Sequence, residues 1–487
     1  MATAPRPATT VPAIGKPVGE LKKLVSLVDR DVFDDYVYPA GSDKTVFQPD
    51  YKPYHNLTLD TLVLPFTGNP AWGQRITFAV PHPWQGDFIN YITLRLKPYS
   101  WLSYEAQRRI GPDVADWVLL DPSNFYIWAN SLGSIAIERA EMEIDGAIVE
   151  QFSGDWINVW NKTAHDVSSA TPFDDGIYGS TAGPRTVNNF KVSEDGYVYC
   201  YLPFMFSKFK NAAFPMLSCA RANTIRFHIT LKQFKHVVRK IASPLVCDET
   251  PLGKNIQIRD YSFPFRVNNT FTTSSTIPGF EAADLLLGVS YIDGELRKAY
   301  IETPNELLVN PVVESVFAEP LKYVVNISST IKIGLPITTA NGPIRQLIFF
   351  LRRNAAVQQY NDWNNYGATL EGETDPVWNP ERPLLQRAQL LVGTAVWADE
   401  DERWWRAASN LSLPGGVRGY GNYIYAYNFA EAPADFDPSG TLNANRADMR
   451  LNLTVPGFDG EWSVHVFVVG TNWMRFQNGL ANMVFMD

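Results

Sequence analysis

The chain is poor in cysteine and has no long apolar run, and each absence excludes a class of protein. Its 487 residues include only three cysteines, Cys200, Cys219 and Cys247, and no pair has CxxC spacing. A sparse, odd-numbered set argues against a disulfide framework and for a reducing compartment. No stretch reaches the roughly 18 consecutive apolar residues of a transmembrane helix, and the N-terminus lacks the pattern of a secretory signal. We therefore expect synthesis and folding in the cytosol.

An excess of basic residues is also lacking. The sequence has 42 lysines and arginines against 51 aspartates and glutamates, which gives a formal net charge of −9. An acidic chain repels the phosphate backbone of DNA or RNA. We therefore expect no direct contact with nucleic acid.

Catalytic motifs are absent from the sequence. Neither HExxH, nor GxSxG, nor a phosphate-binding loop occurs. The six histidines are scattered without paired ligand spacing: His55, His82, His165, His228, His236 and His465. We interpret His228 and His465, which fall in predicted strands, as structural imidazoles. The sequence thus predicts no catalytic, cofactor-binding or metal site, no cofactor and no enzymatic activity.

Three charged or glycine-rich segments are candidate binding sites. The acidic run Ala398–Glu402 lacks the D-x-D-x-D-G pattern of a calcium loop, so we expect a solvated loop. The glycines of Gly415–Gly421 precede a predicted strand and open no helix, so we expect a mobile loop instead of a phosphate site. A basic cluster suggests a face that meets a neighbouring subunit or an anionic surface: Lys232, Lys235, Arg239 and Lys240.

What the sequence does contain is the pattern of a β-sandwich, clearest at Asn422–Val455. Aromatic residues alternate with smaller ones at its start, and aliphatic residues alternate with polar ones at its end: Tyr423, Tyr425, Tyr427 and Phe429, then Leu451, Leu453 and Val455. A period of two with aromatic and aliphatic side chains predicts strands. The segment DFDPSGTLN between them predicts a tight corner. Strand, corner and strand form the repeating unit of a sandwich.

Length predicts two domains, because a single hydrophobic core stops growing near roughly 250–300 residues. Alternating strands recur in two blocks on either side of a Pro- and Gly-containing segment. We therefore divide the chain into an N-terminal arm at 1–50, a first sandwich at 51–240, a linker at 241–258 and a second sandwich at 259–487. Two polar excursions, 162–195 and 360–420, are expected at the outer surface and between neighbouring subunits; the second contains NDWNNYG at Asn361–Gly367.

Within the first block, Trp128–Asn161 carries several local signals. Apolar residues with one phase slip predict a long strand with a bulge. Asp145-Gly146 predicts a hairpin turn. Trp156 and Trp160, four residues apart, predict a helix from Gly154 onward.

The N-terminal arm combines proline-rich and amphipathic parts. Apolar residues recur at helical spacing after the prolines and predict a short helix: Leu21, Leu24, Val25 and Val28. Lys22 and Lys23 add basic charge beside this stripe. Two interpretations stay open, a helix docked on its own domain and an arm that binds another surface.

Six motifs in the same order along the chain resemble those of the major capsid proteins of nucleocytoplasmic large DNA viruses. They are EIDGAIVEQFSGDWINVWN, then YCYLPFMFSK followed by FPMLSCARANTIRFHI, then IRQLIFFLRRN, NDWNNYG, the PSG corner, and VHVFVVGTNWMRFQNGLANMVF. The resemblance implies an all-β fold of two consecutive eight-stranded jelly-roll sandwiches with long loops and few short helices. It also implies three chains in a pseudo-hexagonal capsomer, and capsomers that tile an icosahedral shell around an internal membrane.

The same resemblance implies the partners and the location of the chain. The partners are two further copies in a homotrimer, neighbouring capsomers, minor capsid proteins and, through the N-terminal arm, the internal membrane. The location is the virion, after synthesis and assembly in the host cytoplasm.

Paired tryptophans support one alternative function. Trp404 and Trp405 lie near two carboxylates, Asp399 and Glu402, and exposed tryptophan with a carboxylate pair is typical of glycan-binding or glycan-cleaving sandwiches. We favour the capsid interpretation and expect these tryptophans to pack under a loop or at a subunit contact.

Overall fold

The computed structural model forms two compact units, Met1–His55 and Asn56–Asp487. It describes residues 32–37, 55–68, 70–98, 125–129, 131–164, 197–208, 212–219, 221–222, 224–241, 280–319, 330–339, 342–368, 382–413, 423–433, 437–446, 448–456 and 460–484. The first unit contains helix α2, Val32–Val37. Several predicted segments lie outside the described residues: the helix at 21–28, most of the excursion 162–195, the linker from 242 onward, and the glycine-rich loop 415–421.

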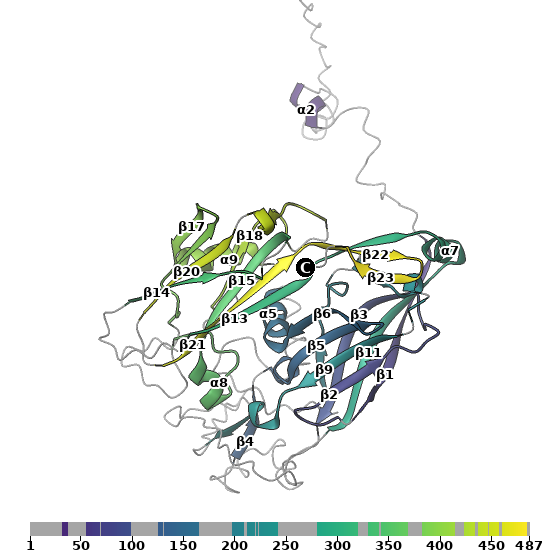
Figure 1. Ribbon diagram of the computed structural model, residues 1–487, viewed down its shortest axis with the longest axis horizontal. Coiled ribbons are helices and arrows are strands. Elements are labelled where there is room, and N and C mark those ends of the chain that lie inside the picture. Colours follow the sequence, from purple (N-terminus) through teal and green to yellow (C-terminus); the bar gives the residue numbers. More distant parts are fainter. Residues whose placement is uncertain are drawn as a thin grey trace, which may run out of the picture. The chain divides into compact units, whose positions relative to one another are not determined.

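The second unit contains two sets of eight strands that follow one another along the chain (Figure 1). The first set comprises β1 (Leu57–Thr67), β2 (Arg75–Ala79), β3 (Phe88–Pro98), β5 (Ile137–Ile144), β6 (Ala147–Ser153), β7 (Val198–Tyr201), β9 (Ile225–Leu231) and β11 (Phe280–Ile292). The second set comprises β13 (Val312–Glu319), β14 (Thr330–Pro336), β15 (Pro343–Arg353), β16 (Arg387–Val392), β17 (Ala395–Asp401), β18 (Ile424–Asn428), β20 (Met449–Pro456) and β21 (Trp462–Gly470).

Both sets have the same strand order. The first set forms the rows β1-β11-β3-β7 and β2-β9-β5-β6, which are joined where the end of β1 pairs with β2. The second set forms the rows β13-β21-β15-β18 and β14-β20-β16-β17. Numbered by position within each set, the rows are 1-8-3-6 and 2-7-4-5 in both cases. Two four-stranded layers with this crossed order form a jelly roll, so the prediction of two consecutive jelly-roll sandwiches is confirmed.

Strand β11 lies beyond the predicted linker, and it corrects that boundary. Its residues pair with β1 from Leu57↔Ile292 to Pro65↔Asp284, and with β3 on the other side. It is therefore the eighth strand of the first sandwich, although the prediction assigned its residues to the second. The prolines and glycines at 241–258 belong to the connection between the seventh and eighth strands, and local turn signals do not distinguish such a connection from a linker.

The local predictions around the first hairpin are confirmed. Asp145 and Gly146 have φ of 50° and 87°, which is the pair of positive values that a two-residue hairpin turn requires. The pairing of β5 with β9 shifts register between Ile137 and Arg139, at the predicted phase slip. Helix α5, Gly154–Ala164, follows β6 directly.

The remaining elements are short. The helices are α4 (Leu132–Ile135), α7 (Gly294–Glu302), α8 (Asn354–Tyr360) and α9 (Glu402–Ser412), with single 3₁₀ turns at η3 (Met216–Cys219), η4 (Phe234–His236) and η5 (Ala444–Arg446). The extra strands are β4 (Phe125–Trp128) with β10 (Val238–Ile241), β8 (Phe214–Pro215), β19 (Leu442–Asn443), and the sheet β12-β22-β23, formed by Asn305–Val309, Asn472–Gln477 and Leu480–Met483. None of the helices in the described ranges has the length and hydropathy needed to cross a bilayer.

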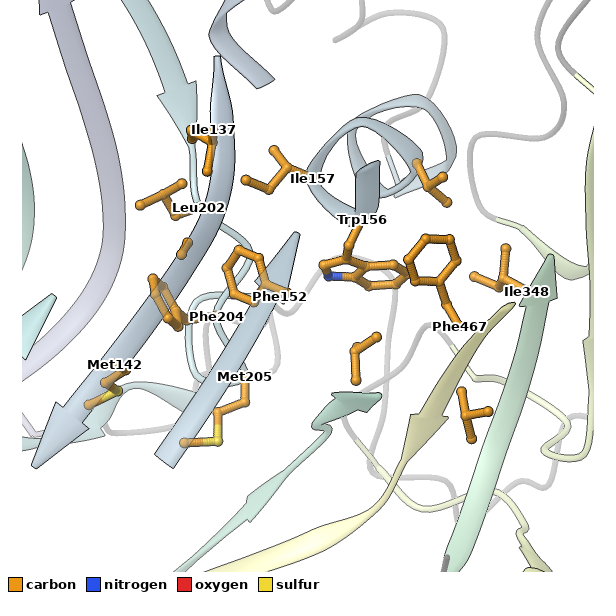
Figure 2. Close-up of a cluster of buried hydrophobic side chains, with 14 of the residues drawn as sticks. Ile137, Met142, Phe152, Trp156, Ile157, Leu202, Phe204, Met205, Ile348 and Phe467 are labelled. Atoms are coloured by element: carbon orange, nitrogen blue, oxygen red, sulfur yellow. The ribbon is translucent and has the colours of Figure 1, made fainter. Parts of the chain in front are cut away.

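The cores of the two sandwiches form one continuous apolar cluster. Figure 2 shows Trp156 of α5 between Phe152 and Phe204 of the first sandwich and Phe467 of the second. The ring centroids of Trp156 and Phe467 are 5.3 Å apart, within the range of favourable aromatic contact. Helix α5 therefore carries one of the apolar contacts between the two sandwiches.

The PSG corner packs around a buried arginine of β15. The Arg345 Nη2 atom donates to the carbonyl oxygen of Asp437 at 2.9 Å and to that of Ala432 at 3.3 Å. The Ser439 hydroxyl oxygen accepts from the backbone N–H of Ala432 at 2.9 Å. The corner thus supplies carbonyl acceptors that a buried guanidinium requires.

Candidate functional site: the joint between the two sandwiches

Helix α5 begins at a position that only glycine fits. A Cβ at Gly154 would overlap the carbonyl oxygen of Ile137 and lie 2.7 Å from that of Ser134. These are backbone atoms of β5 and α4, so they cannot rotate away as a side chain would. The close approach sets the position of the next residue, Asp155, at the first turn of α5.

Asp155 forms a bidentate ion pair with Arg352 of β15 in the second sandwich. Its two oxygens accept from Nη1 at 2.7 Å and from Nη2 at 3.0 Å. Both side chains are largely buried, with 13% and 6% of their surface exposed. Burial alone would raise the pKa of Asp155, but the charge and hydrogen bonds of Arg352 outweigh it and hold this pKa well below its usual range.

His465 of β21 extends this network. Its Nε2 atom lies 3.3 Å from Arg352 Nη2 and 3.3 Å from the Ser463 hydroxyl, and its Nδ1 lies 3.5 Å from a Glu314 oxygen. Its ring stacks on Phe350 at a centroid distance of 4.7 Å. The ring thus lies among polar groups and on an aromatic face, as a structural imidazole does.

Asp155, Glu314 and His465 also resemble a metal-ligand set, because one donor atom from each lies within 4.8 Å of the others. Both Asp155 oxygens already accept from Arg352, and the charge of Lys232 also acts on Asp155. Two basic side chains beside two carboxylates oppose the addition of a divalent cation. The donor set therefore does not fit a metal ion, and the sequence prediction of no metal site stays a prediction.

His228 has a similar place within the first sandwich. Its Nδ1 atom lies 2.9 Å from the Thr77 hydroxyl, and its Nε2 lies 2.9 Å from a Glu143 oxygen. The hydrogen bond with His228, with a smaller contribution from Arg226, lowers the pKa of Glu143 although burial opposes it. Thr77, His228 and Glu143 lie on the neighbouring strands β2, β9 and β5, and their hydrogen bonds link these strands to one another.

The NDWNNYG segment lies inside the joint, which corrects its predicted place in a surface excursion. Asn364 accepts from Asn158 of α5 at 2.6 Å and donates to the Ser131 hydroxyl at 2.8 Å. The Tyr366 hydroxyl accepts from the same Asn158 amide at 2.7 Å. Trp363 Nε1 donates to the carbonyl oxygen of His236 at 2.9 Å. The segment is polar because it satisfies buried groups of the first sandwich, not because it faces solvent.

The basic cluster does not form a single outward face. Lys232 places Nζ 3.8 Å from the ring centroid of Trp363, and burial lowers its pKa to about 8. Lys235 is exposed, and its carbonyl oxygen accepts from Asn361 at 2.6 Å. The side chains of Arg239 and Lys240 lie outside the described residues. Lys232 therefore belongs to the joint and does not share one outward face with Lys235, and contact of the cluster with a partner stays a prediction.

A second contact between the sandwiches involves Lys208, which bonds to Asn310 between β12 and β13 and interacts electrostatically with the buried Glu150. The Lys208 Nζ atom donates to the carbonyl oxygen of Asn310 at 2.9 Å. Nearby Glu150 accepts from the Met205 backbone N–H at 2.7 Å. Burial raises the pKa of Glu150 to about 7 and lowers that of Lys208 to about 8, and their mutual attraction opposes both shifts.

The acidic run at 398–402 is not a solvated loop. It ends edge strand β17 and begins α9, where the Asp401 side chain accepts from the Trp404 backbone N–H at 3.0 Å as a helix N-cap. Trp405 is buried and donates through Nε1 to the carbonyl oxygen of Ala388 at 2.9 Å. Trp405 thus packs against strands of the second sandwich and not under a loop, whereas Trp404 is partly exposed, and a subunit contact there stays a prediction.

The two carboxylates of the glycan alternative lie in different environments. Asp399 pairs with Arg387 at 2.7 Å on the exposed side of β16 and β17. Glu402 is buried and accepts from the Tyr425 hydroxyl at 3.2 Å. Each is engaged by its own partner, so the pair does not flank a common substrate position.

Known proteins resemble this chain over almost its whole length. Residues 45–276 match the family described as "Major capsid protein N-terminus". The major capsid protein of Pyramimonas orientalis virus is 20% identical over 96% of this chain and 100% of its own length. That of Paramecium bursaria Chlorella virus 1 is 22% identical over 90% of this chain and 87% of its own. These likenesses support a major capsid protein of nucleocytoplasmic large DNA viruses.

Solved structures show the same double jelly-roll fold. The Faustovirus major capsid protein superposes with a TM-score of 0.64 at 13% identity, covering 94% of this chain and 96% of its own. The quasi-atomic model of the PBCV-1 virus capsid gives a TM-score of 0.64 at 15% identity, covering 91% and 100%. As a major capsid protein, the chain has a structural role in the virion and is not an enzyme. Neither glycan cleavage nor another catalytic activity accords with this family.

Proposed function

We propose that three copies of this capsid protein form a pseudo-hexagonal capsomer and that capsomers tile an icosahedral shell. The observation that supports this is the repetition of one strand order in two joined sandwiches. Three such chains around a threefold axis present six similar sandwiches, so a trimer has nearly hexagonal symmetry and packs into a hexagonal lattice.

An exposed apolar row on the first sandwich supports lateral contact between copies. Leu57, Leu59 and Val63 alternate on the outer face of β1, and each is more than half exposed. Tyr91 of β3 lies on the same face, with its ring against Gly288 of β11. Stable obligate interfaces bury about 2,000–5,000 Å² and are more apolar than the remaining surface.

The test of this proposal is the oligomeric state. Light scattering or mass photometry of the purified protein at micromolar concentration should give a trimer, and electron microscopy should show pseudo-hexagonal particles. The Leu59→Asp/Val63→Asp variant should remain folded by circular dichroism but lose the trimer. A monomeric wild-type protein would contradict the proposal.

The partners follow from the same proposal. The capsomer contacts neighbouring capsomers and minor capsid proteins, the N-terminal arm 1–50 reaches the internal membrane, and assembly takes place in the host cytoplasm. The net charge of −9 opposes direct contact with the genome. Deletion of residues 1–28 should leave a trimer of nearly unchanged melting temperature that forms no closed particles. A truncated protein that melts several degrees lower, or that becomes monomeric, would assign the arm to the packing of the trimer itself.

A further inference from the structure

A cleft of about 1260 Å³ opens between the two sandwiches, next to the joint. One wall is β6, the end strand of its row, and another is β13, the end strand of a row in the second sandwich. Residues of strands β22 and β23 also line the cleft. Within the described residues, β6 and β13 each pair on one side only, so both present backbone groups that can pair with an added extended segment.

Apolar side chains lie exposed along these walls. Ile148 of β6 is 51% exposed, Val316 of β13 is 53% exposed, and Leu480 of β23 is 44% exposed. They come from three separate strands, yet they line one cleft. A concave apolar surface of this kind is typical of a binding site for another protein.

The charge of the cleft indicates which kind of segment fits. Apart from Asp155, which pairs with Arg352, its lining contains four carboxylates and two basic side chains: Glu138, Asp145, Glu150 and Glu314, against Arg139 and Lys232. Glu150 is only 5% exposed, and although the charge of Lys208 acts on it, its Oε1 atom has no hydrogen-bond partner among the described residues. An unsatisfied buried carboxylate oxygen is costly, and a lysine or arginine brought by a ligand would satisfy it.

We propose that this cleft binds an extended segment of a separate polypeptide that carries apolar side chains and a lysine or arginine directed at Glu150. The chain itself has a net charge of −9, so the acidic cleft favours a basic partner over the body of a second copy. The inference rests on the proposed function, because a segment of this kind would bind once capsomers assemble with other capsid components.

Photo-crosslinking in assembled particles tests the proposal. With p-benzoylphenylalanine in place of Ile148, irradiation should attach the cleft to one segment of a different polypeptide, and mass spectrometry should show that this segment is basic and apolar. Attachment to the body of a second copy, to the N-terminal arm of this chain or to lipid would overturn the proposal, as would intact particles without a cross-link. Loss of trimers and particles in the wild-type protein would overturn the proposed function and the inference with it.

Two substitutions examine the chemistry of binding. Glu150→Gln, in the protein that carries the photo-crosslinker, should lower the yield of the cross-link about tenfold or more, because a charged hydrogen bond is lost. The matched control is Glu281→Gln on β11, outside the cleft, which should leave the yield unchanged. Val316→Asp should abolish the cross-link, whereas Ile301→Asp, on exposed α7, should not. Equal yields in Glu150→Gln and in its control would remove Glu150 from the site and overturn the proposal.

Discussion

Asp155 and Arg352, 197 residues apart in the chain, form the bidentate ion pair that joins the two sandwiches. The pair is largely withdrawn from solvent and lies beside the Trp156–Phe467 contact. Breaking a buried pair by removing one partner leaves the other charged and unsatisfied, which costs far more than breaking an exposed pair.

Asp155→Asn should therefore lower the free energy of unfolding by about 3–5 kcal/mol. Urea unfolding followed by tryptophan fluorescence measures this change. The matched control is Arg475→Met, which breaks the exposed pair of Arg475 with Glu306 and should cost less than about 1 kcal/mol. Equal effects of the two substitutions would show that the buried pair adds nothing specific.

The same pair gives a signed dependence on pH. Because the folded-state pKa of Asp155 is held well below its usual value of 3.8, the pair contributes stability above that pH and loses it as the pH falls. Between about pH 5 and pH 2, the wild-type protein should lose more stability than Asp155→Asn does. Parallel curves for the two proteins over this range would contradict the assignment.

Glu150 should act in the opposite direction. Burial raises its pKa from 4.5 to about 7, so its contribution to stability is fully present below pH 4.5 and is lost as the pH rises through 7. Over this range, the stability of Glu150→Gln relative to wild type should rise by on the order of 3 kcal/mol. Denaturant titrations at several pH values measure the difference. A Glu150→Gln curve that runs parallel to the wild-type curve would contradict the assignment.

Gly154→Ala should destabilise the joint by at least about 2 kcal/mol, because the added methyl group would overlap backbone oxygens of β5 and α4. Thermal unfolding measures the cost, and near-ultraviolet circular dichroism should register the displaced tryptophans of α5. Gly294→Ala is the control: its Cβ would meet no atom within 4 Å, and its melting temperature should not fall. A normal melting temperature for Gly154→Ala would mean that α5 can begin elsewhere.

Trp405→Phe should cost about 1–3 kcal/mol, because the Ala388 carbonyl oxygen loses its buried indole donor. Trp404→Phe, at the partly exposed neighbour, should change stability by less than about 0.5 kcal/mol. Chemical unfolding of the two variants checks both values. A larger loss for Trp404→Phe would reverse the structural roles assigned to the two tryptophans.

The strands were predictable because their signals are local. Leu451, Leu453 and Val455 alternate with polar residues in the sequence, and β20 buries those three side chains. The hairpin at Asp145-Gly146 required only a turn preference. Such patterns depend on neighbours one or two residues away, so they can be recognised without knowledge of the fold.

The joint was not predictable in this way. Asn364 forms hydrogen bonds with Asn158 and Ser131, which lie more than 200 residues away in the chain. When such partners are unknown, a polar segment is predicted to be a surface loop. Likewise, nothing in the sequence around Asp155 or Arg352 indicates that these two side chains pair. One missed feature did carry a local signal: Asp401, three residues before Trp404, is a helix N-cap pattern that opposes the loop prediction for the acidic run.

The buried joint also has a mechanical consequence. Bending one sandwich relative to the other would separate Asp155 from Arg352 and open the contact of Trp156 with Phe467, so each chain resists internal flexing. In the proposed shell, curvature would therefore be taken up at the contacts between chains and not by a hinge within each chain.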